Sequence, residues 1–138
     1  MDFQQMTSPC GLDCFNCPFF RSLDDELLRR EVAERRDIPY DRAVCHGCRN
    51  EKGIIPPLNM KQACNVYRCI QNKQLTFCFE CTDFPCDHLH PYADQAQEVA
   101  HNTKIFNLCL IKKMGLELWA TTKADKVATT YFTEKLTL

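Results

Sequence analysis

The chain has 138 residues, a length that one hydrophobic core accommodates, and its formal net charge is −1 with 25% charged residues. This balance gives no electrostatic attraction to nucleic acid, and no apolar run approaches the length of a membrane span. Eleven of the residues counted as hydrophobic are cysteines, which leaves a thin stock of aliphatic and aromatic side chains. We therefore expect something besides the core to stabilise the fold.

The N-terminus, MDFQQMTSPCG, has neither the basic nor the apolar region of a secretory signal, so we expect a cytoplasmic protein. Thiols stay reduced in that compartment, where a dense cysteine pattern indicates metal or redox chemistry. Eleven cysteines also cannot all pair into disulfides within one chain.

The first predicted elements are a loop over residues 8–20, which carries prolines and a glycine among its cysteines, and a helix over residues 22–37. Ser22 is the expected N-cap of this helix, and Pro39 would end it. Its expected apolar stripe consists of Leu23, Leu27, Leu28 and Val32.

The same helix carries acids one turn before its bases. This spacing predicts a solvated helix face with ion pairs, and not a phosphate-binding patch. The expected pairs are Asp25 with Arg29, Glu26 with Arg30, and Glu31 with Arg35.

The middle of the chain is predicted to be irregular apart from one helix. Residues 45–58 form a CxxC turn and a proline-rich connector, residues 61–73 contain no helix breaker, and residues 77–86 read as a loop. The C-terminal part is predicted to be helical over residues 87–101, 102–115 and 115–129, and residues 130–138 form a strand or a tail. Asn102 would cap the second of these helices and Gly115 would end it.

Ten cysteines fall into four groups, three of which contain a CxxC. A CxxC turn suits a metal because two thiolates converge on one ion while backbone amides stabilise their charge. Repetition of the motif strengthens the prediction. The candidate metal ligands are Cys10, Cys14 and Cys17; Cys45 and Cys48; Cys64 and Cys69; and Cys78, Cys81 and Cys86.

The opening stretch CGLDCFNCP has the CxxxCxxC spacing by which radical S-adenosylmethionine enzymes hold an iron–sulfur cluster. The chain is too short for the barrel of such enzymes. Asn16 stands where their motif usually has an aromatic residue, and seven further thiols are at hand. We therefore interpret this stretch as one part of a metal-wrapping scaffold.

The sequence leaves the division of these cysteines into sites open. Cys45, Cys48, Cys64 and Cys69 are close to the spacing of a structural zinc site. If Cys64 and Cys69 both lay in one helix, however, they would point about 140° apart, too far for one ion. Either the helix begins after Cys64, or the two cysteines serve different metals.

Two further divisions remain. The loop that carries the first three cysteines could take its fourth ligand from Cys78, Cys81 or Cys86. Alternatively, the first two CxxC pairs join each other, while Cys64 or Cys69 joins the late group. The two pairs of this second division are Cys14 with Cys17 and Cys45 with Cys48.

The remaining cysteine and the histidines are expected to have no metal role. Cys109 shares an apolar helical face with Ile105 and Leu108, so we interpret it as a small buried hydrophobe. His46 is expected to point to solvent and His101 to lie at a helix end. The pair that could replace a cysteine ligand is His88 and His90, but thiolates are already in surplus.

The order of the motifs CGLDCFNCPFF, CHGCR, CNVYRC and FCFECTDFPC resembles a family of short, cysteine-rich bacterial and archaeal proteins known only as a domain of unknown function. The resemblance covers residues 9 to about 90, and the region around MGLELW resembles the family's C-terminal end more loosely. It implies a metal-binding module without an assigned activity. The family's cysteines correspond to the ten candidate ligands above, and Cys109 lies outside the shared motifs.

We therefore expect a single domain over residues 1–138, in which residues 1–90 form the cysteine-rich metal-binding part and residues 91–138 a helical part. Its fold class is a small metal-stabilised domain, mainly α with irregular cysteine-bearing loops. The expected function is a zinc-binding, non-catalytic interaction or regulatory module with a protein partner, and without nucleic acid or membrane.

Two alternatives for its function stay open: an iron–sulfur protein with a redox or sensing role, and a thiol–disulfide protein that uses Cys45 and Cys48. No Walker loop, GxSxG, HExxH or CxxCH motif is present, so we do not expect an enzyme. If a metal site did have an open position, Asp83, Asp87 and His88 would be the first candidates for catalysis.

Overall fold

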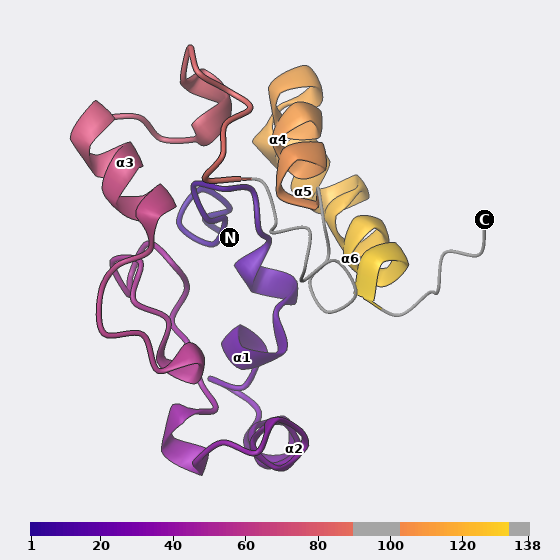
Figure 1. The fold of residues 1–138 in the computed structure, drawn as a ribbon. Helices are drawn as coiled ribbons and strands as arrows, with labels where there is room; N and C mark the ends of the chain where they lie inside the picture. The colour runs from indigo at the N-terminus through magenta and orange to yellow at the C-terminus, as the bar shows by residue number, and fades with distance from the viewer. Residues whose placement is uncertain (90–102, 133–138) are drawn as a thin grey trace, which may run out of the picture.

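The computed structural model describes residues 1–89 and 103–132, and in these ranges the protein is mainly helical (Figure 1). No strand occurs in the described ranges, where the extended backbone forms one antiparallel bridge between Thr7 and Asp13. The elements, with η for 3-10 turns, are η1 (Cys14–Asn16), α1 (Pro18–Arg21), α2 (Glu26–Arg36), η2 (Tyr40–Arg42), η3 (Pro56–Leu58), α3 (Asn65–Lys73), η4 (Cys78–Glu80), α4 (Thr103–Met114), α5 (Leu116–Thr122) and α6 (Ala124–Phe132). The mainly α prediction is confirmed, whereas stabilisation by metal stays a prediction.

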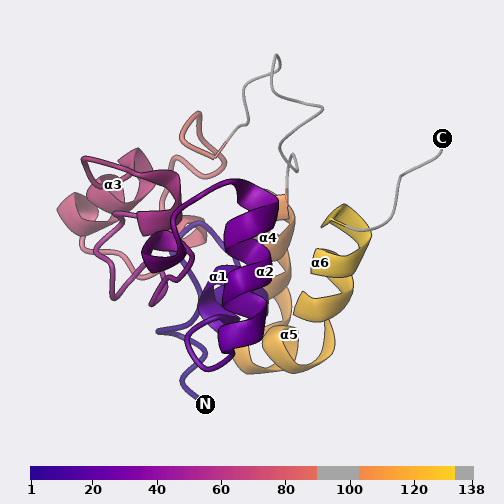
Figure 2. The ribbon, with the colours of Figure 1, turned by 90° about the horizontal axis from the view of Figure 1, so that it is seen from below.

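The helices are distributed around the cysteine-bearing loops. Helices α4, α5 and α6 pack against one another, and α3 lies on the opposite side of the molecule from α6 in both ribbon views (Figures 1 and 2). The N-terminal loop runs between α3 and α4 (Figure 1). Within the described ranges, no helix combines the length and the apolar character needed to cross a bilayer.

Helix α2 begins later than the sequence predicts. The side chain of Asp25 accepts a hydrogen bond from the N–H of Leu28 at 2.9 Å and therefore acts as the N-cap. Ser22, the predicted N-cap, instead ends the short helix α1, and its hydroxyl donates to the carbonyl of Pro18 at 2.7 Å. Aspartate is as good a cap as serine, so propensity alone did not separate the two positions.

The apolar stripe predicted for α2 is wrong in part. Leu27 is 80% exposed, while the helix buries Val32 and Ala33. Leu28 is half-buried, and Leu23 is exposed and lies before the helix.

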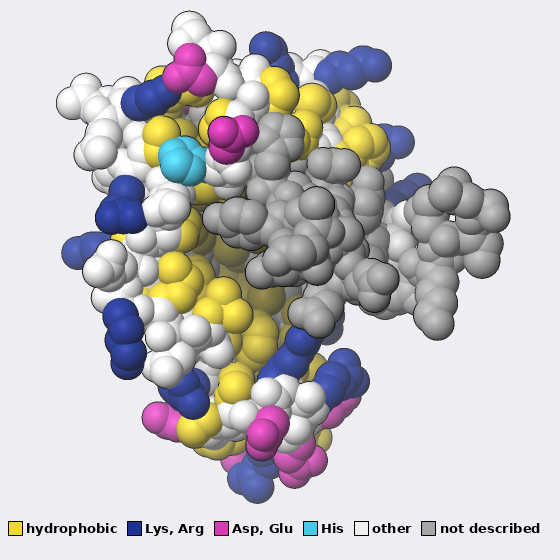
Figure 3. All heavy atoms as spheres, in the orientation of Figure 1, with side chains coloured by type: hydrophobic (Ala, Val, Ile, Leu, Met, Phe, Trp, Pro, Cys, Tyr) yellow, Lys and Arg dark blue, Asp and Glu magenta, His cyan; other side chains and the backbone are white. Residues whose placement is uncertain are grey.

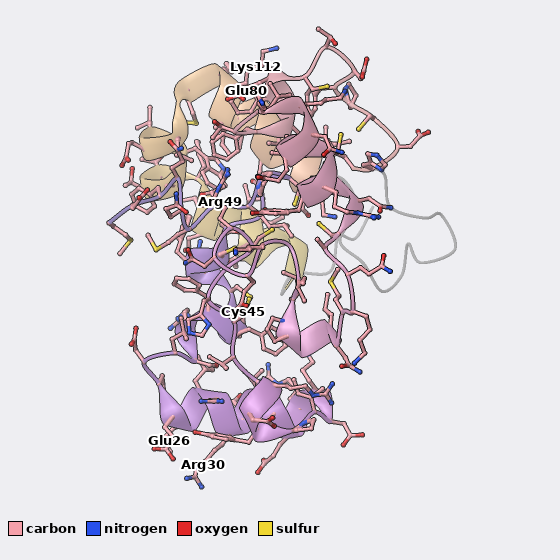
Figure 4. The ribbon with its side chains drawn as sticks, turned by 90° about the vertical axis from the view of Figure 1, so that its left-hand side faces the viewer. Glu26, Arg30, Cys45, Arg49, Glu80 and Lys112 are labelled. Carbon is pink, nitrogen blue, oxygen red and sulfur yellow. The ribbon has the colours of Figure 1, made fainter. Side chains whose placement is uncertain are left out.

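Two of the three predicted ion pairs of α2 are confirmed. Glu26 and Arg30 lie 2.6 Å apart and point away from the molecule (Figure 4), and a second exposed pair, Glu31 with Arg35, lies at 2.7 Å. The third prediction is wrong because Asp25 caps the helix, and Arg29 instead donates to the carbonyls of Tyr40 and Asp41.

One hydrophobic cluster joins three parts of the chain that are distant in sequence. It contains Val66 and Ile70 from α3, Phe77 from the following loop, and Leu108 from α4, together with the buried Cys10 and Cys78. Gly11 allows this approach, since its φ is +86° and an added Cβ would lie 2.9 Å from the Leu108 side chain. The CGL motif is therefore the place where the N-terminal loop contacts α4.

The second cluster lies among the C-terminal helices, around the fully buried Trp119. Phe15 packs edge-on against this ring at 6.0 Å between centroids. Asn107 connects the two clusters, because its amide donates to the carbonyl of Gly11 at 2.8 Å and accepts from the Trp119 indole at 3.3 Å. The C-terminal helices are thus tied to the first cysteine loop.

One of the predicted helix boundaries in this part agrees with the structure, and the others differ from it. Helix α4 ends at Met114 before Gly115, as predicted, and the helical stretch that follows is divided at Lys123 into α5 and α6. Of the predicted helix over 87–101, residues 87–89 form a turn and residues 90–101 lie outside the described residues, as does the cap Asn102. Residues 130–132 belong to α6 and not to a strand, and residues 133–138 lie outside the description.

Candidate metal centre

Four candidate ligands line one cavity of about 390 Å³ between α3 and the loop that follows it. The wall also contains Lys73, Asp83 and His88. We call these four cysteines the cavity group: Cys69, Cys78, Cys81 and Cys86. On the face drawn in Figure 3, side chains of the hydrophobic class, which includes cysteine in this colouring, gather in a hollow with lysines and arginines along its edge.

Local hydrogen bonds fix the loop that carries three members of this group. The Glu80 carboxylate accepts the N–H groups of Thr76 and Phe77 at 2.7 and 3.3 Å, which holds the turn before Cys78. The N–H of Cys81 donates to the carbonyl of Cys78 at 3.1 Å and closes the CxxC turn. Cys69 comes from the middle of α3, so a helix and a loop supply the group together.

A charged triad borders the cavity at Cys81. The Lys73 ammonium donates to the Cys81 sulfur at 3.0 Å and to the Asp83 carboxylate at 2.7 Å. The N–H of Asp83 also points to this sulfur at 3.4 Å. Lys73 lowers the pKa of Asp83, and Asp83 with Cys81 raises the pKa of Lys73, so both charges are held at neutral pH.

Cys78 lies deeper in the structure than the other cavity cysteines. Burial raises the pKa of its thiol to about 12, and the neighbouring thiols of Cys10, Cys86, Cys69 and Cys81 act in the same direction. A buried thiolate is costly without a compensating positive charge, which a bound cation supplies.

The other six candidate ligands gather where the first loop meets the CHGC turn. The N–H of Cys45 donates to the carbonyl of Phe19 at 2.9 Å, which attaches the CHGC turn to the CFNC turn. Figure 4 shows Cys45 and Arg49 in the loops between α2 and the rest of the molecule. We call the four cysteines of these two CxxC turns the turn group: Cys14, Cys17, Cys45 and Cys48.

Buried thiols of the turn group lie close to one another. Burial raises the pKa of Cys14 to about 11, and the thiols of Cys17, Cys10 and Cys45 raise it as well, whereas the N–H of Cys48 lowers it. Burial also raises the pKa of Cys17 and Cys45. Burial therefore favours the neutral form of each of these thiols.

Cys10 and Cys64 flank the turn group. Cys10 lies 3.1 Å from the hydroxyl of Ser8 and is an electrostatic neighbour of Cys14, Cys48 and Cys78, so it stands between the two groups. Cys64 is the N-cap of α3, and its sulfur accepts the N–H of Tyr67 at 3.3 Å.

The thiols of Cys48 and Cys64 are neighbours that titrate together. Their interaction raises the pKa of Cys48 and lowers the pKa of Cys64, and the amides at the start of α3 favour the charged form of Cys64. Cys48 thus faces Cys64, whereas the thiol–disulfide hypothesis paired it with Cys45.

Arg49 holds the CHGCR segment against two other loops. Its guanidinium donates to the carbonyls of Thr7 and Thr76, both at 2.8 Å, and lies over the Phe77 ring at 4.9 Å. Burial lowers its pKa. Sequence analysis did not single out Arg49, and its only signal was its place directly after the CxxC turn.

The donor chemistry of both groups fits a thiophilic metal, because every candidate ligand is a cysteine. The sulfurs are not yet close enough together to coordinate one ion. Among residues 1–89 and 103–132, no three cysteine, histidine, aspartate or glutamate side chains stand at the spacing of a bound ion. A single ion would therefore draw the thiols closer together.

The structure bears on the spacing of Cys64 and Cys69. Helix α3 begins after Cys64, so the first predicted explanation is confirmed. Cys69 lines the cavity and Cys64 is a neighbour of Cys48, while the explanation that they serve different metals stays a prediction. Cys109 is exposed, which contradicts its predicted burial, because α4 turns Asn107, Leu108 and Ile111 inward.

Of the histidines, His46 is exposed as predicted and lies 2.9 Å from Glu51. His88 is exposed at the wall of the cavity, while His90 and His101 lie outside the described residues. Sequence analysis missed Lys73, although its spacing of four residues from Cys69 places both on one helical face.

A protein-family model matches residues 6–91, and its description is Protein of unknown function (DUF3795). This range covers more than half of the chain and contains both cysteine groups with Cys10 and Cys64, but not Cys109. No curated protein and no solved structure matches the chain.

Proposed function

The chain belongs to the family described as Protein of unknown function (DUF3795), and we propose that it is a zinc-binding interaction or regulatory module. The observation that carries this proposal is the cavity group: four cysteines from α3 and the next loop line a single cavity. Four thiolates without another ligand are typical of closed tetrahedral zinc sites, which stabilise folds and do not catalyse reactions.

Zinc would stabilise a fold whose hydrophobic clusters are small. The binding of a structural zinc is worth on the order of 10 kcal/mol, which is comparable to the stability of a whole domain. Ligands on α3 and on the η4 loop would be joined through the ion. Loss of the metal would therefore remove the link between α3 and the η4 loop.

The partner we propose for this module is another protein in the cytoplasm. The near-neutral net charge of −1 gives no attraction to nucleic acid. An interaction function needs no reactive group at the metal, and the four cysteines of the cavity group would fill the coordination of one tetrahedral ion.

A second candidate function is an iron–sulfur protein, and the size of the cavity favours it. About 390 Å³ corresponds to roughly a dozen water molecules, far more than one ion fills. Cysteine is the usual ligand of iron–sulfur clusters, whose several atoms occupy more space. The Lys73 ammonium would then stabilise the electron-rich thiolate of Cys81.

Metal analysis of the full chain purified without oxygen separates these functions. We expect tightly bound zinc, no visible absorption, and unfolding when a strong chelator removes the metal. A brown protein that contains iron and acid-labile sulfide would instead identify it as an iron–sulfur protein. A chain that contains neither metal and keeps its fold in the chelator contradicts both proposals.

Paired substitutions then locate the site. Cys69→Ser with Cys81→Ser should remove metal from the cavity group, whereas Cys109→Ser should not, because Cys109 is exposed and outside both groups. Unchanged metal content in the first variant would contradict the cavity as the site.

A further inference from the structure

The two CxxC turns of the first half of the chain contact each other. We infer that the turn group, Cys14, Cys17, Cys45 and Cys48, is a second metal centre for the same class of thiophilic divalent ion. This inference deepens the proposed function and rests on it. None of the four residues lines the cavity, so the second centre is separate from the first.

Backbone contacts bring the two turns together. The N–H of Cys45 donates to the carbonyl of Phe19 at 2.9 Å, just beyond the CFNC turn. Gly47, inside the CHGC turn, has a φ of +90°, and an added Cβ there would lie 3.5 Å from the Phe20 ring and 3.8 Å from Cys14 Cβ. The CHGC turn therefore lies directly over the CFNC turn.

Backbone hydrogen bonds fix the two CxxC segments in different ways. The N–H of Cys17 donates to the carbonyl of Cys14 at 2.9 Å, and η1 forms a closed turn between them. After the second segment, the N–H of Glu51 donates to the carbonyl of Gly47 at 2.9 Å, which holds the chain that follows Cys48 in place. The first pair of thiols therefore starts from a closed turn, and the second is held from its two ends by the bonds of Cys45 and Glu51.

A backbone amide points at one of the four sulfurs, because the Cys45 sulfur accepts the N–H of Gly47 at 3.4 Å. Burial raises the pKa of Cys14 and of Cys17, and nearby backbone amides oppose this rise: the N–H of Cys48 for Cys14, and the N–H groups of Phe19 and Phe20 for Cys17. N–H groups directed at cysteine sulfurs stabilise thiolate charge, and this arrangement accompanies metal–thiolate sites. The amides therefore indicate sulfurs prepared for charge.

The two flanking cysteines have other partners. The Cys10 sulfur lies 3.1 Å from the Ser8 hydroxyl, and the Cys64 sulfur accepts the N–H of Tyr67 at the start of α3. Neither belongs to a CxxC turn. Cys64 nevertheless faces Cys48, so it is the residue that must be tested as a competing ligand.

The test titrates the metal-free full chain with cobalt(II), which occupies tetrahedral thiolate sites and gives them visible absorption. We expect two equivalents of cobalt per chain. Cys14→Ser with Cys45→Ser should remove one equivalent, and Cys69→Ser with Cys81→Ser should remove the other. Cys109→Ser is the matched control and should retain two equivalents. Cys64→Ser tests the competing ligand and should also retain two.

Failure of the inference differs from failure of the proposed function. If the wild type binds one equivalent, and only the cavity variant loses it, the second centre is wrong and the first stands. If the wild type binds no cobalt, the proposed function is wrong. Loss of an equivalent in Cys64→Ser would overturn the assignment of the four ligands.

A measurement on the wild type covers the case in which a variant does not fold. Alkylation of the cobalt-loaded chain followed by mass spectrometry should leave Cys14, Cys17, Cys45 and Cys48 unmodified, while exposed Cys109 is modified. Modification of all four turn-group thiols at two bound equivalents would overturn the inference.

Discussion

The ammonium of Lys73 donates a hydrogen bond to the sulfur of Cys81 at 3.0 Å, on the wall of the cavity that three further cysteines line. Lys73 follows Cys69 by one helical turn, so α3 supplies both a ligand candidate and a charge to the same site. Asp83 holds the ammonium in place at 2.7 Å. The helix thus balances part of the negative charge that thiolates bring to the cavity.

Removal of this charge should weaken metal binding. We expect Lys73→Met to lower zinc affinity by up to about tenfold, because partners of ligating groups usually contribute ten- to a hundredfold and Lys73 is partly solvated. Lys73→Arg should retain most of the affinity. Competition with a chromophoric chelator measures the zinc affinity of each variant. Lys112→Met, at an exposed position of α4 (Figure 4), is the control, and equal losses in the Met and Arg variants would contradict the role of charge.

Gly53 is required where the connector passes α3. Its φ is +77°, and an added Cβ would lie 2.5 Å from the Tyr67 Cβ, while its carbonyl accepts the N–H of Cys64 at 3.0 Å. Gly53→Ala should therefore suffer both backbone strain and a clash.

Gly115 provides the matched control for this substitution. Its φ is +87°, but nothing lies within 4 Å of an added Cβ. Backbone strain alone should therefore lower the free energy of unfolding of Gly115→Ala by about 1–3 kcal/mol. We expect Gly53→Ala to lower the free energy of unfolding by about 1–3 kcal/mol more than Gly115→Ala does, because the added methyl group overpacks against Tyr67. Urea unfolding of the metal-loaded proteins measures both values. Equal losses would show that Tyr67 moves aside without cost.

The buried amide of Asn107 should matter more for stability than any surface residue of α4. Truncation by Asn107→Ala leaves the Gly11 carbonyl and the Trp119 indole N–H without their partner. Each unsatisfied buried group costs about 1–3 kcal/mol, so we expect a loss of about 2–5 kcal/mol. The exposed control on the same helix, Lys113→Met, should change the free energy of unfolding by less than about 0.5 kcal/mol. A loss below about 1 kcal/mol in Asn107→Ala would contradict this account.

The features that the sequence predicts correctly are local ones. The CxxC turns at Cys14 and Cys78, the end of α4 before Gly115 and two ion pairs of α2 all depend on residues within about one turn of each other. The same holds for Cys64 and Cys69, since their spacing alone excluded one shared ion for a helix that runs through both. Short-range geometry is enough to constrain such features.

The features that the sequence leaves open depend on contacts between distant segments. Cys69 joins the late cysteines only because α3 packs beside the η4 loop, and Cys14 approaches the CHGC turn only through the hydrogen bond from Cys45 to Phe19. Cys109 was expected to be buried because its neighbours are apolar. In fact Asn107, a polar residue with two buried partners, sets the rotation of α4 and turns Cys109 outward.

Asp13 gives the protein a pH dependence that can be isolated. Burial raises the pKa of its carboxyl, although the Asn16 amide donates to it at 2.7 Å and opposes the rise. The folded state therefore binds the proton more tightly than the unfolded state, whose aspartate pKa is about 3.9. It follows that the Asp13 carboxyl contributes most to the stability of the folded state at a pH below that value. This contribution is lost as the pH rises through the raised pKa of Asp13 in the folded state.

Substitution of Asp13 by asparagine removes this titration and keeps an oxygen that accepts from Asn16. Wild type and Asp13→Asn should be similar in stability near pH 3.5, and the variant should become the more stable one as the pH rises to 7. Urea unfolding of both proteins at each pH measures the difference, in which metal loss on acidification is common to both. A difference that stays constant between pH 3.5 and 7 would show that the Asp13 carboxyl titrates alike in the folded and unfolded chains.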